Sequence, residues 1–376
     1  CEEALEAANR LGYPVLVRPS YVLGGQNMII AYQDADITEY MKIILAQGIE
    51  NPILIDQYLQ GVEAEADAIC DGEDVLIPGI MEHVERSGIH SGDSIAVYPP
   101  IHVDEVHKEI ILKHTRNLAK HLGVIGLINV QFIIYNDTVY IIEANPRSSR
   151  TIPYISKVTN VPIIDLATKV MLGAKLKDLG YGTGLYPEAE YFACKMPVFS
   201  FEKLTDVDIN LGPEMKSTGE CLGIAESYPQ ALLKAFKGAN MKVPKRGGRV
   251  IITVKDEDKG EAVSVARELN ELGIELFATK GTYDYLKKAG VEVKKVNRLG
   301  EAHPNLEDMI QSGTVDMIVN TPRRRHREGG DGIKIRRMAV EHSILCITAI
   351  DTAHAILTAR EQGRSVDLTP IDITEI

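Results

Sequence analysis

The segment VQFIIYNDTVYIIEANPRSSR, residues 130–150, constrains the fold of this chain more than any other stretch. Two runs rich in β-branched residues flank a polar turn, which is typical of an antiparallel hairpin. A three-residue loop, 136–138, would pair Gln131 with Glu143 on one face, whereas a two-residue loop would put them on opposite faces. We expect the three-residue loop, because it also brings Asn145 to the face of Gln131 and Glu143.

The three side chains that this register gathers all offer hard oxygen ligands. Magnesium and manganese prefer such oxygens and usually keep water and substrate phosphate as further ligands. Arg147 and Arg150 follow at once and supply guanidinium forks for phosphate or carboxylate oxygens. The alternative is that Gln131 and Glu143 only solvate one side of the hairpin and that the arginines are surface charge. The hairpin alone leaves both interpretations open.

The length of 376 residues predicts two or three domains. No apolar run approaches ~18 residues, so we expect a soluble, cytoplasmic protein with no membrane partner. Five scattered cysteines predict reduced thiols and no disulfide. Lys and Arg number 19 against 32 Asp and Glu in residues 1–240, but 22 against 21 in residues 241–376. The acidic first part argues against a nucleic-acid partner.

Several shorter patterns in the acidic part suit nucleotide binding. A short predicted strand ends in Arg18, and the glycine-containing loop 19–25 suits phosphate, although a simple hairpin turn explains it as well. Residues 62–68 alternate between acidic and apolar side chains, which predicts a half-buried strand. The polar loop 87–94 contains His90, which suits either a phosphate contact or an ordinary place in a loop.

The pattern changes after residues 237–248, where Lys, Pro and Gly accumulate. Short apolar strands then alternate with amphipathic helices, which predicts a doubly wound parallel sheet with ligands beyond the carboxyl ends of its strands. At one strand end Thr279 opens a helix and suits a phosphate, although a simple capped helix start is equally consistent. At another, the basic run 320–325 suits an anion or a solvated loop.

Six motifs, in order along the chain, carry a resemblance to a known family. They are VRPSYVLGG (17–25), EADAICDG (65–72), MEHVERSGIHSGDS (81–94), NVQF (129–132), IEANPRSSRT (142–151) and LGPEMKSTGE (211–220). Together they closely resemble the C-terminal half of the large subunit of carbamoyl phosphate synthetase. The resemblance implies an α/β and α+β multidomain protein. Residues 1–240 would form an ATP-grasp unit with antiparallel sheets that lacks its opening segment, and residues 241–376 a methylglyoxal-synthase-like allosteric domain with a doubly wound parallel sheet.

The implied activity is phosphorylation of carbamate by ATP with Mg²⁺ or Mn²⁺, within glutamine-dependent carbamoyl phosphate synthesis for pyrimidine and arginine biosynthesis. The implied partners are an N-terminal synthetase half, a glutaminase small subunit and a nucleotide effector, in an oligomer. Another ATP-grasp ligase, such as a biotin carboxylase or a peptide-forming ligase, is disfavoured by the second domain and by the HSGDS loop. The remaining alternative is a catalytically silent regulatory and assembly fragment of the same enzyme.

The resemblance also implies the functional residues. Catalysis would use Glu143, Arg147 and Arg150, and the metal would bind Gln131, Glu143 and Asn145. The implied ATP contacts are Arg18, Gln57, Leu59, Glu63, Gly88, Ile89, His90, Ser91, Gln131 and Glu143. The implied effector contacts are Lys259, Thr279, Thr282, Arg298 and Asn320.

Overall fold

The computed structural model describes residues 1–20, 27–46, 52–203, 207–322, 330–361, 369–370 and 372–373. The chain forms two compact units. The first comprises residues 1–94, 100–187 and 211–216, and the second comprises 95–99, 188–210 and 217–376. The domain boundary expected between residues 240 and 241 stays a prediction. Within the described residues, no helix combines the length and the apolar character needed to cross a membrane.

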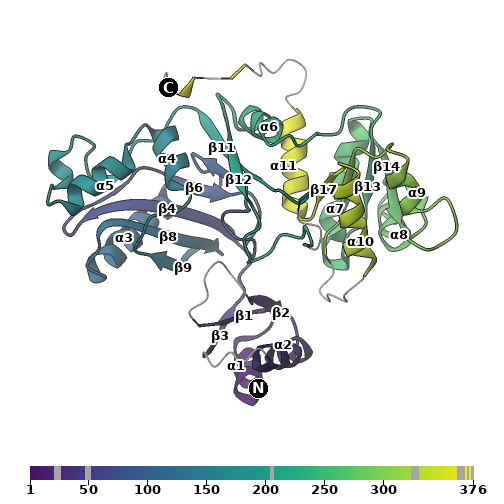
Figure 1. The fold of residues 1–376 in the computed structure, drawn as a ribbon, viewed down its shortest axis with the longest axis horizontal. Helices are drawn as coiled ribbons and strands as arrows, with labels where there is room; N and C mark the ends of the chain where they lie inside the picture. The colour runs from purple at the N-terminus through teal and green to yellow at the C-terminus, as the bar shows by residue number, and fades with distance from the viewer. Residues whose placement is uncertain are drawn as a thin grey trace. The chain divides into compact units, whose positions relative to one another are not determined.

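The first unit begins with a three-stranded antiparallel sheet of order β2-β1-β3, beside two helices (Figure 1). The elements are α1 (Glu2–Leu11), β1 (Val15–Pro19), β2 (Ile29–Ala31), α2 (Asp34–Ala46) and β3 (Ile53–Gln57). Ala8 of α1 and Ile37 of α2 pack with Val15 and Val17 in one apolar core. From residue 21 to residue 26 the expected glycine loop lies outside the described residues.

A larger sheet forms most of the rest of the first unit. Strand β4 pairs antiparallel with β8 along one edge and with β5 and β6 along the other, while β9 pairs with β8. Its strands are β4 (Val62–Asp71), β5 (Val75–Ile77), β6 (Ile80–His83), β8 (Ile125–Tyr135), β9 (Thr138–Asn145) and β10 (Gly184–Leu185), and its helices are α3 (Glu105–His121), α4 (Ile152–Thr159), α5 (Ile163–Met171) and η1 (Leu176–Asp178). Ala66, Val130 and Phe132 pack in one core with Ile111 of α3. The apolar face of β4 therefore supports the sheet, as its alternation predicts.

The expectation that this strand is half-buried is wrong. Glu65 and Asp67, on the acidic face of β4, are only 2% and 1% exposed. Such groups are buried at low cost only when hydrogen-bond donors face them. Here the amide of Asn129 donates to both, and the Thr151 hydroxyl lies within hydrogen-bond distance of both. Both faces of β4 are therefore interior, one apolar and one polar.

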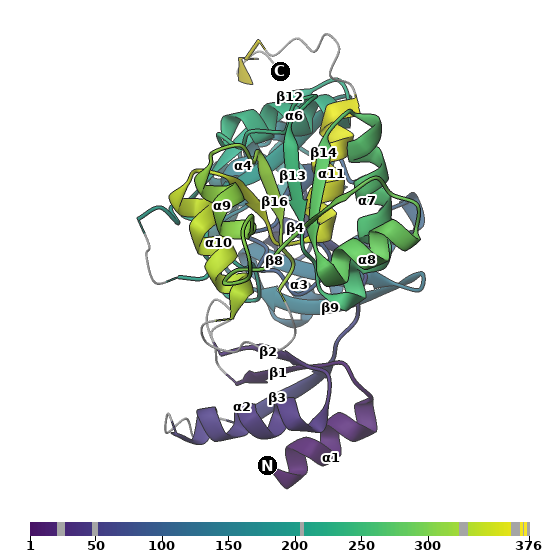
Figure 2. The ribbon, with the colours of Figure 1, turned by 90° about the vertical axis from the view of Figure 1, so that its right-hand side faces the viewer.

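The second unit contains an antiparallel ribbon of order β7-β11-β12 and a five-stranded sheet of order β15-β14-β13-β16-β17. All pairs in the five-stranded sheet are parallel, and Figure 2 shows helices on both of its sides. The doubly wound parallel sheet expected from the sequence is confirmed. The elements are β7 (Ala96–Tyr98), β11 (Phe192–Val198), β12 (Gly219–Ala225), α6 (Tyr228–Gly238), β13 (Arg249–Ile252), η2 (Asp256–Asp258), α7 (Lys259–Glu271), β14 (Glu275–Thr279), α8 (Lys280–Lys288), β15 (Lys294–Val296), α9 (Leu306–Gln311), β16 (Met317–Val319), α10 (Asp331–Glu341), β17 (Leu345–Ile347) and α11 (Ile350–Glu361).

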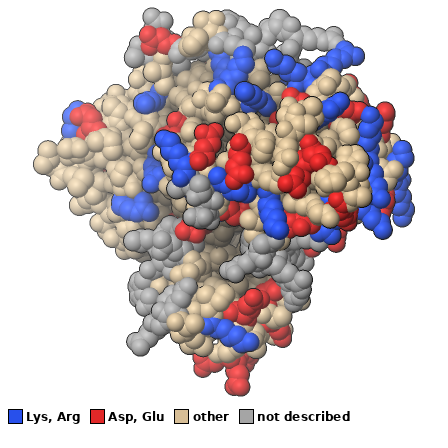
Figure 3. Space-filling model, turned by 45° about the vertical axis from the view of Figure 1, so that its right-hand side comes forward, with Lys and Arg blue, Asp and Glu red and all other residues tan. Residues whose placement is uncertain are grey.

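Charged side chains of both signs are interspersed on the face drawn in Figure 3. Such mixing differs from the single-sign basic stripe that typifies nucleic-acid binding.

Candidate functional site

The hairpin of β8 and β9 begins with a tighter turn than the sequence predicts. Tyr135 pairs with Thr138, so the loop has two residues rather than three. Asn136 and Asp137 have φ of 48° and 57°, and a two-residue type I′ turn requires positive φ at both positions. The expected three-residue loop, 136–138, is wrong because two residues that tolerate positive φ stand side by side.

A β-bulge then restores the expected pairing of the polar residues. Phe132 pairs with Ile141, but Gln131 pairs with Glu143, so Ile142 is an extra residue in β9. An extra residue moves every following side chain to the other face, and this compensates for the shorter turn. Asn145 comes two residues after Glu143, and its Nδ2 donates to Oε1 of Glu143 at 2.9 Å. The structure thus brings the three predicted metal ligands together.

The donor set of the hairpin has the chemistry that a hard cation requires. Gln131 donates through Nε2 to Oγ of Ser91 at 3.2 Å, so the amide nitrogens of Gln131 and Asn145 both serve hydrogen bonds within the protein. Their oxygens, with the Glu143 carboxylate, fit Mg²⁺ that keeps water and phosphate as its other ligands. No cluster of three His, Cys, Asp or Glu side chains suited to a metal occurs among the described residues. The metal role of this mixed set stays a prediction.

Five of the predicted nucleotide contacts lie on one path from the end of β3 to the hairpin: Leu59, Gly88, Ile89, His90 and Ser91. The Tyr58 hydroxyl donates to the carbonyl of Ser87 at 2.5 Å, and the Ser87 hydroxyl donates to the carbonyl of Leu59. Burial raises the pKa of Tyr58 to about 12, so its hydroxyl remains a donor. Gly88 has φ 106°, and a Cβ there would lie 2.9 Å from the Tyr58 hydroxyl. This glycine lets the chain pass Tyr58 toward Ile89 and the residues that follow.

His90 lies where this path meets the hairpin. Its backbone N–H donates to Gly212 at 2.8 Å, and its Nδ1 accepts from the backbone N–H of Gly92 at 3.0 Å. Burial lowers the pKa of His90, and the nearby charge of Arg150 acts in the same direction, while three carboxylates including Glu143 oppose them. The ring is therefore neutral at pH 7 with its proton on Nε2, because Nδ1 is an acceptor. That tautomer suits donation to a phosphate oxygen.

Four other predicted residues are more exposed. Nε of Arg18 lies 3.5 Å from the Asp56 carboxylate, and Gln57 is exposed at the end of β3. In the described part of the chain, no hydrogen bond or ion pair joins either residue to the hairpin. Arg147 and Arg150 are exposed on the loop after β9, where Arg147 donates to the Ser148 carbonyl at 2.9 Å.

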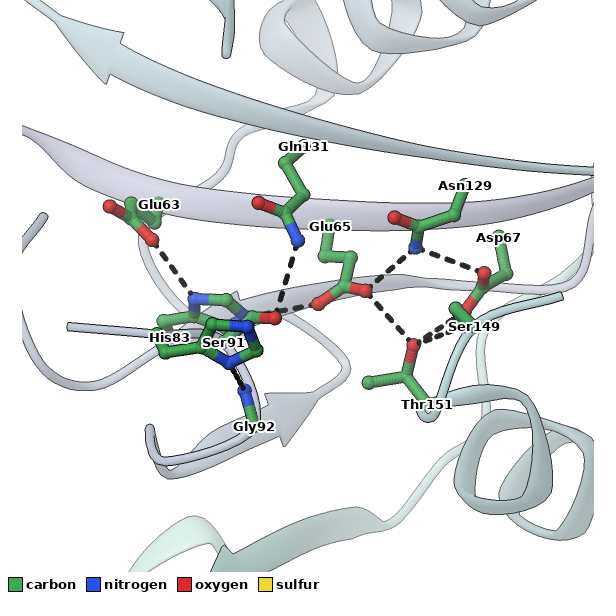
Figure 4. A network of polar contacts seen from close by, with 11 residues as sticks. Glu63, Glu65, Asp67, His83, Ser91, Gly92, Asn129, Gln131, Ser149 and Thr151 are labelled. Carbon is green, nitrogen blue, oxygen red and sulfur yellow. Dashed lines mark hydrogen bonds and ion pairs between the residues drawn. The ribbon is translucent and has the colours of Figure 1, made fainter. Parts of the chain in front are cut away.

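Sequence reasoning missed the buried histidine of the site, which Figure 4 shows between two glutamates. Nδ1 of His83 lies 3.2 Å from Glu63, and Nε2 lies 3.3 Å from Glu65. Full burial lowers the pKa of His83, but the hydrogen bonds and charges of the two carboxylates raise it more, to about 9. His83 is therefore an imidazolium at pH 7, and it binds Glu63, for which the resemblance implies a nucleotide contact.

The same network continues to the loop after β9. Nδ2 of Asn129 donates to Glu65 at 2.7 Å and to Asp67 at 3.0 Å, while the Thr151 hydroxyl lies 2.6 Å from Asp67 and 3.0 Å from Glu65 (Figure 4). Burial and the charge of Glu65 raise the pKa of Asp67 to about 6, although donors including Thr151 and Asn129 oppose them. The acidic alternation of residues 62–68 is the sequence signal that could have pointed to this network.

The second unit gathers three of the five predicted effector residues. Thr279 and Thr253 place their hydroxyls 3.0 Å apart, and the Thr282 hydroxyl accepts from the N–H of Val254 at 3.3 Å. Asn320 donates to the Thr253 carbonyl at 3.2 Å. Thr279 is the N-cap residue of α8, but its side chain makes no capping hydrogen bond. The Thr279 side chain therefore does not cap the helix through a hydrogen bond, and its effector role stays a prediction.

The other two predicted effector residues form ion pairs with carboxylates. Lys259 lies 2.6 Å from Asp256, and Arg298 lies 2.5 Å from Asp331 at the start of α10. From residue 323 to 329 the basic run and its continuation lie outside the described residues. The roles of the five effector residues stay predictions.

The first unit combines antiparallel sheets with this polar site, and the second contains a parallel five-stranded sheet. This is the architecture expected from the sequence for an ATP-grasp unit with an appended α/β domain. Residues 1–179 match the family described as "Carbamoyl-phosphate synthase L chain, ATP binding domain", and residues 261–348 match the "MGS-like domain". The chain is similar along its whole length to the C-terminal part of carbamoyl phosphate synthase large chains.

Two relatives illustrate the match. The carbamoyl phosphate synthase large chain of Lachnoclostridium phytofermentans is 56% identical over 375 residues, and that of Agathobacter rectalis is 52% identical over 376 residues. Each alignment covers 100% of this chain and 35% of the relative, so the chain spans about a third of their length. A solved structure of a biotin carboxylase complex with β-γ-ATP from Campylobacter jejuni has a TM-score of 0.49 and 18% identity, covering 63% of this chain and 59% of that one.

Proposed function

We propose that the first unit transfers the γ-phosphoryl group of ATP to carbamate, giving carbamoyl phosphate and ADP. The observation that carries the proposal is the register of the hairpin, which sets Gln131 opposite Glu143 and bonds Asn145 to Glu143. Two arginines follow within five residues of Asn145. A hard donor set beside guanidinium groups is what phosphoryl transfer requires, because catalysis there consists of positioning and charge neutralisation.

The residues divide this work between them. Gln131, Glu143 and Asn145 would hold Mg²⁺ or Mn²⁺, which would neutralise charge on the phosphate oxygens. Arg147 and Arg150 bind the carbamate and the phosphoryl group through their forked N–H groups. The path from Leu59 to Ser91, together with Glu63, holds the nucleotide, and Nε2–H of His90 donates to a phosphate oxygen. Arg18 and Gln57 belong to the same nucleotide site.

The second unit binds a nucleotide effector at Thr279, Thr282 and Asn320, with Lys259 and Arg298 offsetting its charge. Hydroxyls and an amide at the carboxyl ends of parallel strands support this role, because ligands of such sheets lie there. The partners that fit are an N-terminal synthetase half and a glutaminase small subunit, in an oligomer. The pathway is glutamine-dependent synthesis of carbamoyl phosphate for pyrimidines and arginine.

The test is the reverse reaction: formation of ATP from MgADP and carbamoyl phosphate by this chain, with and without added Mg²⁺. Formation of ATP only with the metal present supports the proposal. The absence of ATP at every metal concentration counts against it and favours a catalytically silent regulatory fragment.

A further inference from the structure

Thr151 stands at a position where threonine usually caps a helix, but its side chain acts elsewhere. It is the N-cap residue of α4, and the structure gives it no side-chain capping hydrogen bond. A threonine at this position normally accepts from the first free N–H groups of the helix. Here the hydroxyl instead lies 2.6 Å from Asp67 and 3.0 Å from Glu65. The local preference has given way to a contact with a strand more than eighty residues away in the sequence.

The Thr151 hydroxyl is fixed from several directions. It has one proton, and the shorter distance assigns that proton to Asp67 rather than Glu65. The Ser149 hydroxyl lies 2.8 Å away and can donate in return. Glu65 and Asp67 are themselves held by both hydrogens of the Asn129 amide. These contacts favour one orientation of the hydroxyl, because rotation would remove one of the hydrogen-bond donors of a buried carboxylate.

The contact of the Thr151 hydroxyl with Asp67 and Glu65 attaches the arginine-bearing loop to the protein interior. Every residue from 143 to 151 is described, and Thr151 is the buried one among them, with 4% of its surface exposed. Arg147 and Arg150 are exposed on the same loop, and Arg150 precedes Thr151 directly. The position of the backbone at Thr151 therefore sets where the Arg150 side chain begins.

We propose that Thr151 is a positioning residue: its hydroxyl, held by Asp67 and Glu65, fixes the loop 145–150 so that Arg147 and Arg150 meet the phosphoryl group. This inference rests on the proposed function for its kinetic consequence. Misplacement of a catalytic group by about 1 Å can reduce a rate by about 100-fold. Loss of the hydroxyl should therefore lower the rate of the chemical step more than the affinity for the nucleotide.

The experiment compares Thr151→Val with Thr151→Ser and with Thr159→Val. Thr159 is the matched control, because it is a buried threonine of the same helix whose hydroxyl donates to the Ile155 carbonyl at 2.7 Å. The measurements are kcat and KM for ATP formation from MgADP and carbamoyl phosphate, and the dissociation constant of MgADP. We expect kcat of Thr151→Val to fall about 10- to 100-fold with unchanged MgADP affinity, and the other two variants to keep the wild-type kcat. Equal kcat values in Thr151→Val and Thr159→Val would overturn the proposal.

A second variant, Thr151→Ala, guards against misfolding of the valine variant. Amide hydrogen exchange measures the mobility of the loop without requiring enzymatic activity. The smaller side chain leaves room for a water molecule to serve Asp67, so this variant retains the fold more readily than valine. We expect faster exchange at residues 145–150 in Thr151→Ala than in Thr159→Ala, and identical exchange in the two would refute the positioning role. A wild-type chain that forms no ATP would refute the proposed function instead, while the exchange comparison would still decide the role of Thr151.

Discussion

Protonation of the buried His83 should make the stability of the first unit depend on pH. The folded-state pKa is about 9, against an ordinary value of 6.5. Since a pKa difference of one corresponds to about 1.4 kcal/mol, protonation of His83 stabilises the folded first unit by about 3 kcal/mol. The ring is fully buried, so solvent does not screen its contacts with Glu63 and Glu65. Because the folded pKa lies above the unfolded pKa, this stability is complete below about pH 6.5 and is lost as the pH rises through about 9.

The assay is NMR of ¹³Cε1-labelled histidine from pH 6 to pH 10, with urea unfolding at the same pH values. His83→Gln identifies the resonance of His83 and removes its share of the fall in unfolding free energy between pH 6.5 and pH 9. Glu65→Gln should move the midpoint of that resonance toward the ordinary value, because it removes one charged partner. A midpoint below about 7 in the wild type would show that desolvation outweighs the two carboxylates, and the reasoning would be wrong.

Three further substitutions test the two proposed sites and a buried ion pair of the second unit. Glu143→Gln should reduce metal-dependent ATP formation by at least about 100-fold without unfolding the chain; Asp137→Asn, in the same hairpin, is the control, and retained turnover would argue against the metal assignment. Thr279→Ala should weaken the binding of nucleoside monophosphates by about tenfold through loss of one hydrogen bond, as measured by calorimetry with Thr358→Ala as the control. Arg336→Met should lower the free energy of urea unfolding by about 3 kcal/mol, because Arg336 is 3% exposed and makes two hydrogen bonds to Asp208, at 2.7 and 2.6 Å. Arg249→Met breaks the half-exposed pair of Arg249 with Glu275 and should lower the free energy of unfolding by less than about 1 kcal/mol. Equal losses in the two variants would contradict this expectation.

The sequence could predict the pairing of Gln131 with Glu143 but not the way the chain achieves it. Apolar and polar alternation states which side chains share a face, because one face must be buried. It does not distinguish a three-residue loop from a two-residue turn with a bulge, since both place Glu143 opposite Gln131. The positive φ at Asn136 and Asp137 favours the second solution. The preference of Asn and Asp for positive φ predicts the length of the loop better than alternation does. Alternation is sufficient to predict which side chains meet at the site.

Local patterns could indicate the acidic face of β4 but not its burial, because the groups that bury it lie far apart in the sequence. Alternation indicates one polar and one apolar face for β4, and polar faces are usually solvated. What buries Glu65 and Asp67 is donation from Asn129 and Thr151, which are 62 to 86 residues away. The parallel sheet of the second unit could be predicted, because alternating apolar strands and amphipathic helices specify it locally.

The charges of the network also define the pH range in which Thr151 can act as proposed. Above about pH 9 His83 loses one of the two ring protons that face Glu63 and Glu65. Below about pH 6 Asp67 gains a proton, and its hydrogen bond with Thr151 then lacks the charge that makes such bonds strong. Between these limits a charged Asp67 and a protonated His83 coexist on one buried face of the sheet. The loop with the two arginines is therefore best held in the neutral range, where a carboxylate still accepts from Thr151 and an imidazolium still offsets its neighbours.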